Sequence, residues 1–358
     1  MRSPLKVLVV GVGGMGASHA RGYTKLPGFK LVGFVVAKNV DRAARLAADL
    51  KLDIPVYTDF EKAMAEQKPD VVSINTLPDT HAPYAIRAMR RGCHVFMEKP
   101  IAHTVAEADE VARVARETNR KLLIGYILRV HPAWTKFIEL ARTLGKPLIM
   151  RMNLNQQSWG REWEVHKSFI AQVPPIVDCG VHYVDVMCQM TRAKPVLVQG
   201  IAARVSEEIA PDASNYGALQ VVFEDKSVGW YEVGWGPMIS KTAFFVKDVI
   251  GPKGCVSIDK DASRVDPSDV SQHTTVDSII VHASTPDANG LQAKKDEVVH
   301  ITDEPDHNEL CRREQEYLYR AITEDIDLSA HVADAVNSLR ICFAAVESAR
   351  TGRAIHLD

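Results

Sequence analysis

The chain has 358 residues, of which 46% are hydrophobic and 25% are charged. Because single hydrophobic cores rarely grow beyond about 250–300 residues, this length favours two domains. The 43 basic residues nearly balance the 45 acidic ones, and the formal charge of -2 excludes the strongly basic surface of a nucleic-acid-binding protein. The first apolar stretch covers only residues 7–10, too short for a signal peptide or a membrane span. We expect a cytoplasmic protein with no nucleic-acid or membrane partner.

The first third of the chain alternates short apolar runs with helical patterns. Central parallel strands are buried on both faces and read as continuous apolar runs, so this alternation indicates an α/β domain with a doubly wound parallel sheet. We assign this domain to residues 1–126. The predicted strands are residues 6–10, 31–36, 71–74, 94–97 and 122–125, and the predicted helices are residues 40–51, 81–91 and 105–118.

The pattern changes in the second part of the chain, residues 127–358, where strands follow one another without intervening helices. This order predicts an α+β domain with a large, mainly antiparallel open sheet. Such a sheet needs its open face covered, and we expect a homodimer or homotetramer to cover it. The predicted strands are residues 148–154, 196–205, 218–223, 228–233, 242–249, 256–259, 278–282 and 297–301, and the predicted helices are residues 132–144, 308–324 and 330–350.

A glycine-rich turn directly follows the first predicted strand. Its sequence is Gly11-Val12-Gly13-Gly14-Met15-Gly16, a G-x-G-x-x-G pattern that opens into a helix. Gly11 permits a tight turn, Gly13 lets the backbone approach a pyrophosphate, and Gly16 allows close contact between helix and strand. The helix N-terminus supplies amide donors for the phosphates. The strand–turn–helix context predicts dinucleotide binding by Gly11, Gly13, Gly14, Met15 and Gly16.

The choice between NAD and NADP stays open. An NAD-binding domain carries an acidic residue about 20 positions after the glycines, and this chain has no carboxylate at Val36, where the second strand ends. Lys38 could face the 2'-phosphate of NADP, or it could be a solvated lysine. The carboxylate of Asp41 is not clear evidence for NAD, because Asp41 could instead cap the helix that follows.

Two further segments carry candidate catalytic groups. Glu98-Lys99-Pro100 follows the strand at residues 94–97, at the edge where open α/β sheets bind ligands. Lys99 is therefore a candidate, although an exposed loop lysine would look the same. In the second domain, Asp178 and His182 lie four residues apart and would share a helix face, so the carboxylate could orient the imidazole. A buried structural histidine is the alternative for His182, and a helix-anchoring carboxylate is the alternative for Asp185.

The cysteines and histidines show no metal-ligand spacing, so we expect no metal. The six cysteines are scattered through mostly apolar segments and are expected to be reduced core residues. Aromatic and polar residues near Trp159, Arg161, Trp163 and His166 suggest a loop lining the substrate site, with Trp163 as a substrate contact.

Four motifs in order make the whole chain resemble the Gfo/Idh/MocA family (glucose-fructose oxidoreductase and inositol dehydrogenase). They are the glycine turn followed by His19, the segment from Thr76 to His81, Glu98-Lys99-Pro100, and the D-x-G-x-H-x-x-D pattern of Asp178 to Asp185. The resemblance implies an N-terminal Rossmann domain, a C-terminal domain with a mainly antiparallel open sheet, and a dimer or tetramer.

The resemblance also implies roles for particular residues. The family's catalytic lysine, aspartate and histidine fall on Lys99, Asp178 and His182, which would contact the substrate as well. Arg129 matches a position that can contact the family's substrates, although domain packing is an alternative. The residues expected beside the cofactor, in addition to the glycine turn and Lys38, are Asn75, Thr76, Pro78, His81, Glu98 and Lys99.

The expected activity is hydride transfer between NAD or NADP and a hydroxyl or keto carbon of a sugar, sugar derivative or polyol. His182 would act as the acid and base, Asp178 would orient it, and Lys99 would stabilise the developing alkoxide. Two alternatives remain: a nicotinamide-dependent glycosidase that oxidises the sugar transiently, and a non-catalytic regulator that senses NAD(P).

Overall fold

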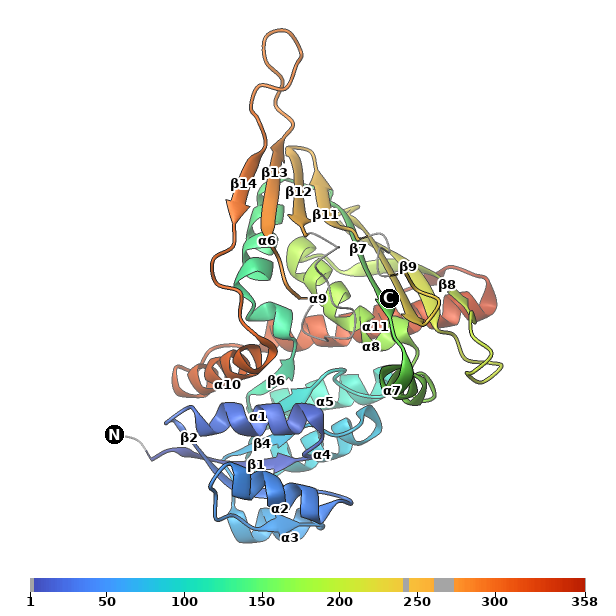
Figure 1. Ribbon diagram of the computed structural model, residues 1–358. Helices are drawn as coiled ribbons and strands as arrows, with labels where there is room; N and C mark the ends of the chain where they lie inside the picture. Colours follow the sequence, from blue (N-terminus) through green and yellow to red (C-terminus); the bar gives the residue numbers. More distant parts are fainter. Residues whose placement is uncertain (1–2, 241–244, 261–273, 358) are drawn as a thin grey trace. The chain divides into compact units, whose positions relative to one another are not determined.

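The computed structural model describes residues 3–240, 245–260 and 274–357, which belong to two compact units (Figure 1). The first unit combines Met1–Val130 with Pro305–Val336. The second combines His131–Glu304 with Asn337–Asp358. Both units are therefore built from two separate stretches of the chain, whereas the sequence pattern suggested one division near residue 126.

The first unit is built on a six-stranded sheet in the order β3-β2-β1-β4-β5-β6, with all neighbouring strands parallel. The predicted doubly wound parallel sheet is thus confirmed. The strand order reverses between β1 and β4, which is where open α/β sheets bind their ligands. The strands are β1 Leu5–Val10, β2 Phe29–Val35, β3 Val56–Tyr57, β4 Val71–Ile74, β5 His94–Glu98 and β6 Leu122–Gly125.

Helices alternate with these strands. The sequence analysis missed β3 and the helix after it, α3, because a two-residue strand carries no periodic signal. Asp59 does mark the start of α3, since its side chain accepts hydrogen bonds from the amides of Glu61 and Lys62. The helices of the alternation are α1 Gly14–Thr24, α2 Val40–Asp49, α3 Phe60–Gln67, α4 Pro78–Arg90 and α5 Val105–Thr118.

A segment far along the chain completes the first unit. Helix α10 (His307–Thr323) packs against α1, and Leu318 and Ala321 join the same hydrophobic core as Val7 and Phe34 of the sheet. The amphipathic pattern of residues 308–324 predicted a helix correctly. The pattern could not tell which sheet the helix covers, because an apolar stripe fits any apolar surface.

The second unit is built on a nine-stranded sheet in the order β14-β13-β12-β11-β7-β10-β9-β8-β15. Among the strand pairs within the described residues, only β7 and β10 are parallel, so the predicted mainly antiparallel sheet is confirmed. The strands are β7 Ile149–Gln157, β8 Pro195–Ala203, β9 Tyr216–Phe223, β10 Val228–Gly236, β11 Lys247–Gly251, β12 Gly254–Asp259, β13 Ser278–Ala283, β14 Glu297–His300 and β15 Ile355–His356.

Helices pack against one face of this sheet. Helices α6 (Pro132–Thr143), α8 (Pro175–Asp178) and α9 (Gly180–Thr191) contact its strands, and Tyr183 of α9 stacks on Tyr231 of β10 with ring centroids 5.0 Å apart. Gly180 leaves little space on either side of α9, because a Cβ there would lie 3.4 Å from the Tyr231 ring and 3.1 Å from the Cys342 sulfur. The last helix, α11 (Ser329–Thr351), carries Cys342.

Two sequence predictions in the second unit need correction. The expected loop around Trp159 to His166 is mostly helical, since α7 spans Gly160–Ile170. Its buried residues Trp163, His166 and Ile170 follow a helical spacing that was overlooked. The strand expected at residues 242–249 begins only at Lys247, and residues 242–244 lie outside the described part of the chain.

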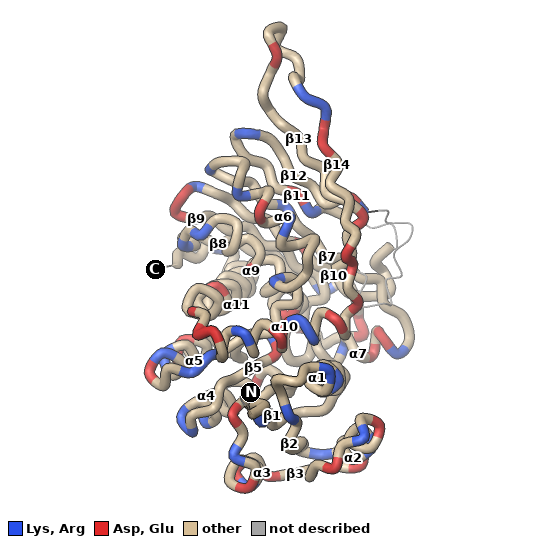
Figure 2. Tube along the Cα trace, turned by 90° about the vertical axis from the view of Figure 1, so that its left-hand side faces the viewer, with Lys and Arg blue, Asp and Glu red and all other residues tan. Residues whose placement is uncertain are grey.

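Over the ranges described above, neither unit concentrates charge of one sign along its chain. Basic and acidic residues are interspersed along both units (Figure 2). All six cysteines are free, and five of them are buried. Within the described residues, no helix combines the length and apolarity needed to cross a membrane.

Candidate active site

The glycine-rich turn forms a tight bend at the carboxyl end of β1. Gly11 has a φ of +83°, and a Cβ at this position would lie 2.6 Å from the carbonyl oxygen of Asn75. A Cβ on Gly16 would overlap the carbonyl oxygen of Gly11, so the helix packs directly on the turn. Gly13 and Gly14 are different, because a Cβ on either would meet no atom within 4 Å.

The start of α1 therefore fits a dinucleotide. No side chain caps the helix at Gly13, and its first turn holds no acidic residue, so the amides face open space and the positive end of the helix dipole is not neutralised. These are the features that bind a pyrophosphate.

The carboxyl end of β2 bears on the cofactor choice. Lys38 is exposed, and Asn39 is the N-cap residue of α2 in the left-handed conformation, with a φ of +62°. Asp41 is exposed in the first turn of α2, where a negative charge suits the helix dipole, but no side chain makes a capping hydrogen bond at this helix start. Neither carboxylate nor ammonium at this edge has a geometry that decides between NAD and NADP.

The segment after β4 lies against the glycine turn. Asn75 is buried and donates from its side-chain amide to Ser73, while Thr76 is partly exposed and its hydroxyl accepts a hydrogen bond from the Thr80 hydroxyl at 2.7 Å. Pro78 occupies the first position of α4, where its fixed φ suits a helix start. Asn75 and Thr76 thus form the wall opposite Gly11.

His81 is completely buried on α4. Its Nδ1 lies 2.7 Å from the carbonyl oxygen of Pro100, and its Nε2 lies 3.1 Å from that of Thr76. Burial lowers the pKa of His81, although both carbonyls and Glu98 oppose this effect. A neutral imidazole has one N–H, so His81 donates a hydrogen bond to one of these carbonyls and contacts the other without a proton between them. Its place in the fold is a support for the two loops that carry Thr76 and Lys99.

Glu98 and Lys99 lie at the carboxyl end of β5. Glu98 is buried, and one carboxylate oxygen accepts a hydrogen bond from His19 Nε2 at 2.6 Å, while the other accepts from the backbone amide of Lys99 at 3.2 Å. Burial alone would raise the pKa of Glu98, but the His19 hydrogen bond and nearby positive charge outweigh it and hold the pKa below its usual value. Lys99 itself is partly exposed.

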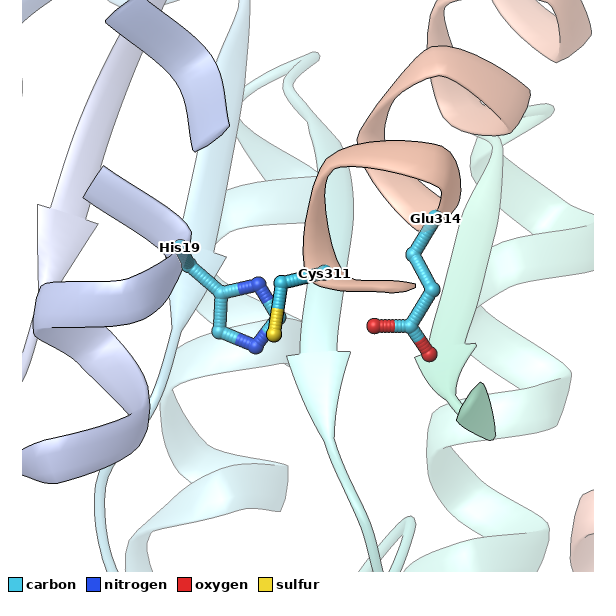
Figure 3. Close-up of side chains that lie close together, drawn as sticks. All are labelled: His19, Cys311 and Glu314. Atoms are coloured by element: carbon cyan, nitrogen blue, oxygen red, sulfur yellow. The ribbon is translucent and has the colours of Figure 1, made fainter. Parts of the chain in front are cut away.

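His19 belongs to a group of three potential metal ligands. One donor atom each of His19, Cys311 and Glu314 lies within 4.8 Å of the others (Figure 3). Both His19 nitrogens are already hydrogen-bonded, however, to Glu98 and Gln315. Burial also raises the pKa of the Cys311 thiol and raises that of the Glu314 carboxyl well above its usual value, so both keep their protons. We therefore assign this group to the interior packing of α1 against α10.

Arg129 lies in the short 3-10 helix η1 (Ile127–Arg129) after β6. Its guanidinium donates to Asp334 at 2.8 Å, and both side chains are largely buried. This ion pair fits the packing alternative for Arg129, and the substrate contact stays a prediction.

Asp178 and His182 lie on neighbouring helices of the second unit. Helix α8 ends at Asp178 and α9 begins at Gly180, and Cys179 between them keeps a right-handed helical conformation (φ -88°, ψ -35°). The four-residue spacing therefore holds as it would in one helix, and both side chains are partly exposed. Asp185 is fully buried and accepts a hydrogen bond from Gln189 at 3.0 Å, as expected of a helix-anchoring carboxylate.

A second histidine belongs to the same region. His166 of α7 is buried and stacks on Trp235 with ring centroids 4.3 Å apart. Burial lowers its pKa to about 4, and the negative charge of Asp178 partly opposes this shift. His166 is therefore neutral near pH 7 and lies within the electrostatic reach of Asp178. Trp163 is only 4% exposed, whereas Trp159 is 64% exposed.

The sequence gave no reason to single out Lys247. This lysine is 2% exposed, and its Nζ donates to the carbonyl oxygen of Asn153 at 2.5 Å and lies 4.0 Å from the ring centroid of Phe245 and 5.1 Å from that of Tyr183. Burial lowers the pKa of Lys247 well below its usual value. From the strand pattern alone, Lys247 would be interpreted as a solvated residue. Its burial depends on the packing of Tyr183 from α9.

Models of one protein family match nearly the whole chain. Residues 5–126 match the model "Oxidoreductase family, NAD-binding Rossmann fold", and residues 141–357 match "Oxidoreductase family, C-terminal alpha/beta domain". The chain belongs to the Gfo/Idh/MocA oxidoreductase family. The resemblance that the motifs suggested is thereby confirmed.

Curated relatives of this family member are dehydrogenases. A UDP-N-acetylglucosamine 3-dehydrogenase from Acidithiobacillus ferrooxidans is 33% identical over 211 residues, which cover 59% of this chain and 62% of the relative. A D-xylose 1-dehydrogenase [NADP(+)] from Haloarcula marismortui is 24% identical, with 62% and 64% covered. A scyllo-inositol 2-dehydrogenase (NAD(+)) from Bacillus subtilis is 25% identical, with 72% and 75% covered. The matches to the first two thus span slightly under two thirds of those relatives.

Solved structures share the fold over the full chain. GenD2 from gentamicin A biosynthesis, in complex with NAD, has a TM-score of 0.77 at 22% identity and covers 100% of this chain and 97% of its own. Myo-inositol 2-dehydrogenase from Lactobacillus plantarum has a TM-score of 0.76 at 20% identity, with 99% and 100% covered. At these identities the likeness concerns the fold alone.

Proposed function

We propose that this family member is an NAD(P)-dependent dehydrogenase or reductase that acts on a CH–OH group of a sugar, sugar derivative or polyol. One observation carries the proposal: Lys99 follows β5 at the carboxyl edge of the sheet, two strands from a turn whose open amides suit a pyrophosphate. The named relatives act on a nucleotide sugar, a pentose and an inositol, which supports a polyhydroxylated substrate.

The residues divide the chemistry between them. The nicotinamide supplies the hydride acceptor or donor. His182 takes the hydroxyl proton during oxidation and returns it during reduction, and Asp178 orients the imidazole. Lys99 stabilises the oxyanion that develops on the substrate, an electrostatic effect that grows where water is excluded. Asp178 and Lys99 also bind neighbouring hydroxyls, with Trp163 and Arg129 as further substrate contacts.

The cofactor is proposed to bind along the carboxyl edge of the first sheet. Gly11, Gly13, Gly14, Met15 and Gly16 receive the pyrophosphate, and Lys38 lies beside the position of the adenosine ribose. Either NAD or NADP fits, since the relatives' names include both cofactors.

Steady-state assays of His182→Ala and Lys99→Met test the proposal. Sugars, polyols and keto-sugars are screened with both cofactors by absorbance of the reduced nicotinamide. Each variant should lose roughly 10²–10⁴-fold in kcat while keeping its dinucleotide affinity within a few-fold. His282→Ala is the control, because His282 is a 44%-exposed histidine on β13. Wild-type turnover in either catalytic variant would contradict its assigned role, and no nicotinamide turnover with any substrate would overturn the function.

We also infer that the helix-free face of the second sheet binds another copy of the chain. The strand register aligns Ile250, Ile149, Val228, Val222 and Leu197 in one row across five strands. Ile149 is 44% exposed and Val228 is 37% exposed, and the others are partly exposed. A continuous apolar row of this kind is typical of an interface, and a homodimer or homotetramer would bury it.

A further inference from the structure

A chain of hydrogen bonds runs from helix α10 to the backbone of Lys99 within the first unit. Gln315 Nε2 lies 2.7 Å from His19 Nδ1, His19 Nε2 lies 2.6 Å from Glu98, and Glu98 accepts from the Lys99 amide at 3.2 Å. Gln315 and His19 are completely buried, and Glu98 is 7% exposed. Solvent therefore takes no part in these contacts.

The contacts fit a neutral His19 imidazole that donates from Nε2 and accepts at Nδ1. The low pKa keeps Glu98 ionised, so its oxygens only accept, and His19 Nε2 must carry the proton of the 2.6 Å contact. A neutral imidazole has no second N–H, so Nδ1 is an acceptor. The side-chain NH₂ of Gln315 supplies the donor that Nδ1 needs. If the Gln315 amide were turned round, its carbonyl oxygen would face the lone pair of His19 Nδ1, and two acceptors would meet.

The packing around Gln315 holds its side chain in this position. The Gln315 amide lies directly against Gly22 of α1, where a Cβ would overlap the side-chain oxygen of Gln315. The His19 ring also contacts Phe96 of β5, with centroids 4.5 Å apart. Gln315 and His19 therefore have little room for another rotamer.

We propose that Gln315 is a positioning residue for Lys99, acting through His19 and Glu98. Gln315 sets the His19 tautomer, His19 holds the Glu98 carboxylate, and Glu98 fixes the amide from which the Lys99 side chain leaves β5. On the other side of Lys99, His81 contacts the carbonyl of Pro100 at 2.7 Å. The lysine backbone is thus supported from both sides, and the role of Gln315 in catalysis depends on the proposed function of Lys99.

No local motif announces this role, because Gln315 and His19 are 296 residues apart in the sequence. The two residues meet only because residues 305–336 pack with the first unit. Residues 305–336 therefore help to support Lys99 in addition to packing in the core of the first unit.

The kinetic test compares Gln315→Met with Gln67→Met. Methionine keeps the length of the side chain and removes the donor, and we expect kcat to fall roughly 10-fold with dinucleotide affinity within about twofold of wild type, because the substrate-facing ammonium is displaced. Gln67 is the matched control, since its amide also donates a side-chain hydrogen bond in this unit, to Tyr57, but lies outside the Lys99 chain. Gln67→Met should keep the wild-type kcat. An unchanged kcat in Gln315→Met would overturn the proposal.

A spectroscopic test reads the tautomer directly in the intact wild-type protein. In ¹⁵N-histidine-labelled protein, with the His19 signals identified by their loss in His19→Gln, Nε2 should be protonated and Nδ1 unprotonated. A protonated Nδ1 would overturn the inference even if Gln315→Met failed to fold. An active Lys99→Met variant would instead overturn the proposed catalytic role of Lys99 while leaving the tautomer result intact, so the two failures are distinguishable.

Discussion

The two sheets of this protein place their polar groups in different positions. In the first unit the strands are apolar throughout, and the polar residues come after them, at the glycine turn, at Asn75 and Thr76, and at Glu98 and Lys99. In the second unit Lys247 and Asn153 are buried in the sheet itself, and the candidate pair Asp178 and His182 is on the neighbouring helices α8 and α9. A parallel sheet covered on both faces leaves only its edge for a ligand, whereas an open sheet has one face for helices and one for a partner.

Gly16→Ala tests the glycine turn at the edge of the first sheet and should have the largest effect of the substitutions below. The added methyl group would overlap the carbonyl oxygen of Gly11, so α1 must shift away from the turn. We expect dinucleotide affinity to fall roughly 100-fold, measured by fluorescence titration with the reduced cofactor. Gly352→Ala is the control: its φ of +68° strains an alanine, but a Cβ there meets no atom within 4 Å and the residue belongs to the second unit, so dinucleotide affinity should not change. Unchanged affinity in Gly16→Ala would show that the turn adapts.

Lys247→Met tests the buried polar group of the second sheet and should stabilise the protein. The low pKa means that burial opposes the charged amine, so methionine, which fills the same space without a charge, should raise the free energy of unfolding by about 1–3 kcal/mol at neutral pH. Denaturant unfolding measures this gain. Lys30→Met on the exposed side of β2 is the control and should change stability little.

The pH dependence of this gain has a defined sign. The amine has a lower pKa in the folded state than the 10.5 usual for lysine, so between those two values the unfolded state binds a proton that the folded state lacks. The stability of the wild type should therefore rise with pH across that window. The advantage of Lys247→Met should be full below the folded pKa and disappear above about 10.5. A gain independent of pH would show that packing, and not charge, causes it.

Ile149→Lys tests the open face and should have the smallest effect on each subunit. A charge in the middle of the apolar row should weaken self-association roughly 10-fold or more, as measured by sedimentation or light scattering, while the unfolding midpoint of the separated subunit changes little. Val40→Lys, at a similarly exposed position of the first unit (42%), should leave association unchanged. Equal association of Ile149→Lys and wild type would exclude this face as the interface.

The sequence predicted the first unit more fully than the second. The strands and glycine turn around Gly11 follow from local rules, because buried parallel strands and positive-φ glycines leave clear signals. The spacing also singled out Asp178 and His182 as candidates, and this spacing survives the break at Cys179. Helix α7 was missed because Trp163, His166 and Ile170 were interpreted as a ligand loop before their helical period was considered.

What the amino-acid sequence determined by itself is therefore local: the two sheet types, the dinucleotide turn, and the candidates Lys99, Asp178 and His182. Only the tertiary structure decided that α10 returns to the first sheet, that Gln315 reaches His19, and that Lys247 lies beneath Tyr183. The physical reason is that a hydrogen-bond donor or an apolar stripe does not specify its partner. Burial selects the partner after distant segments have packed, and only then does the environment shift the pKa of Lys247 or constrain the protons of His19.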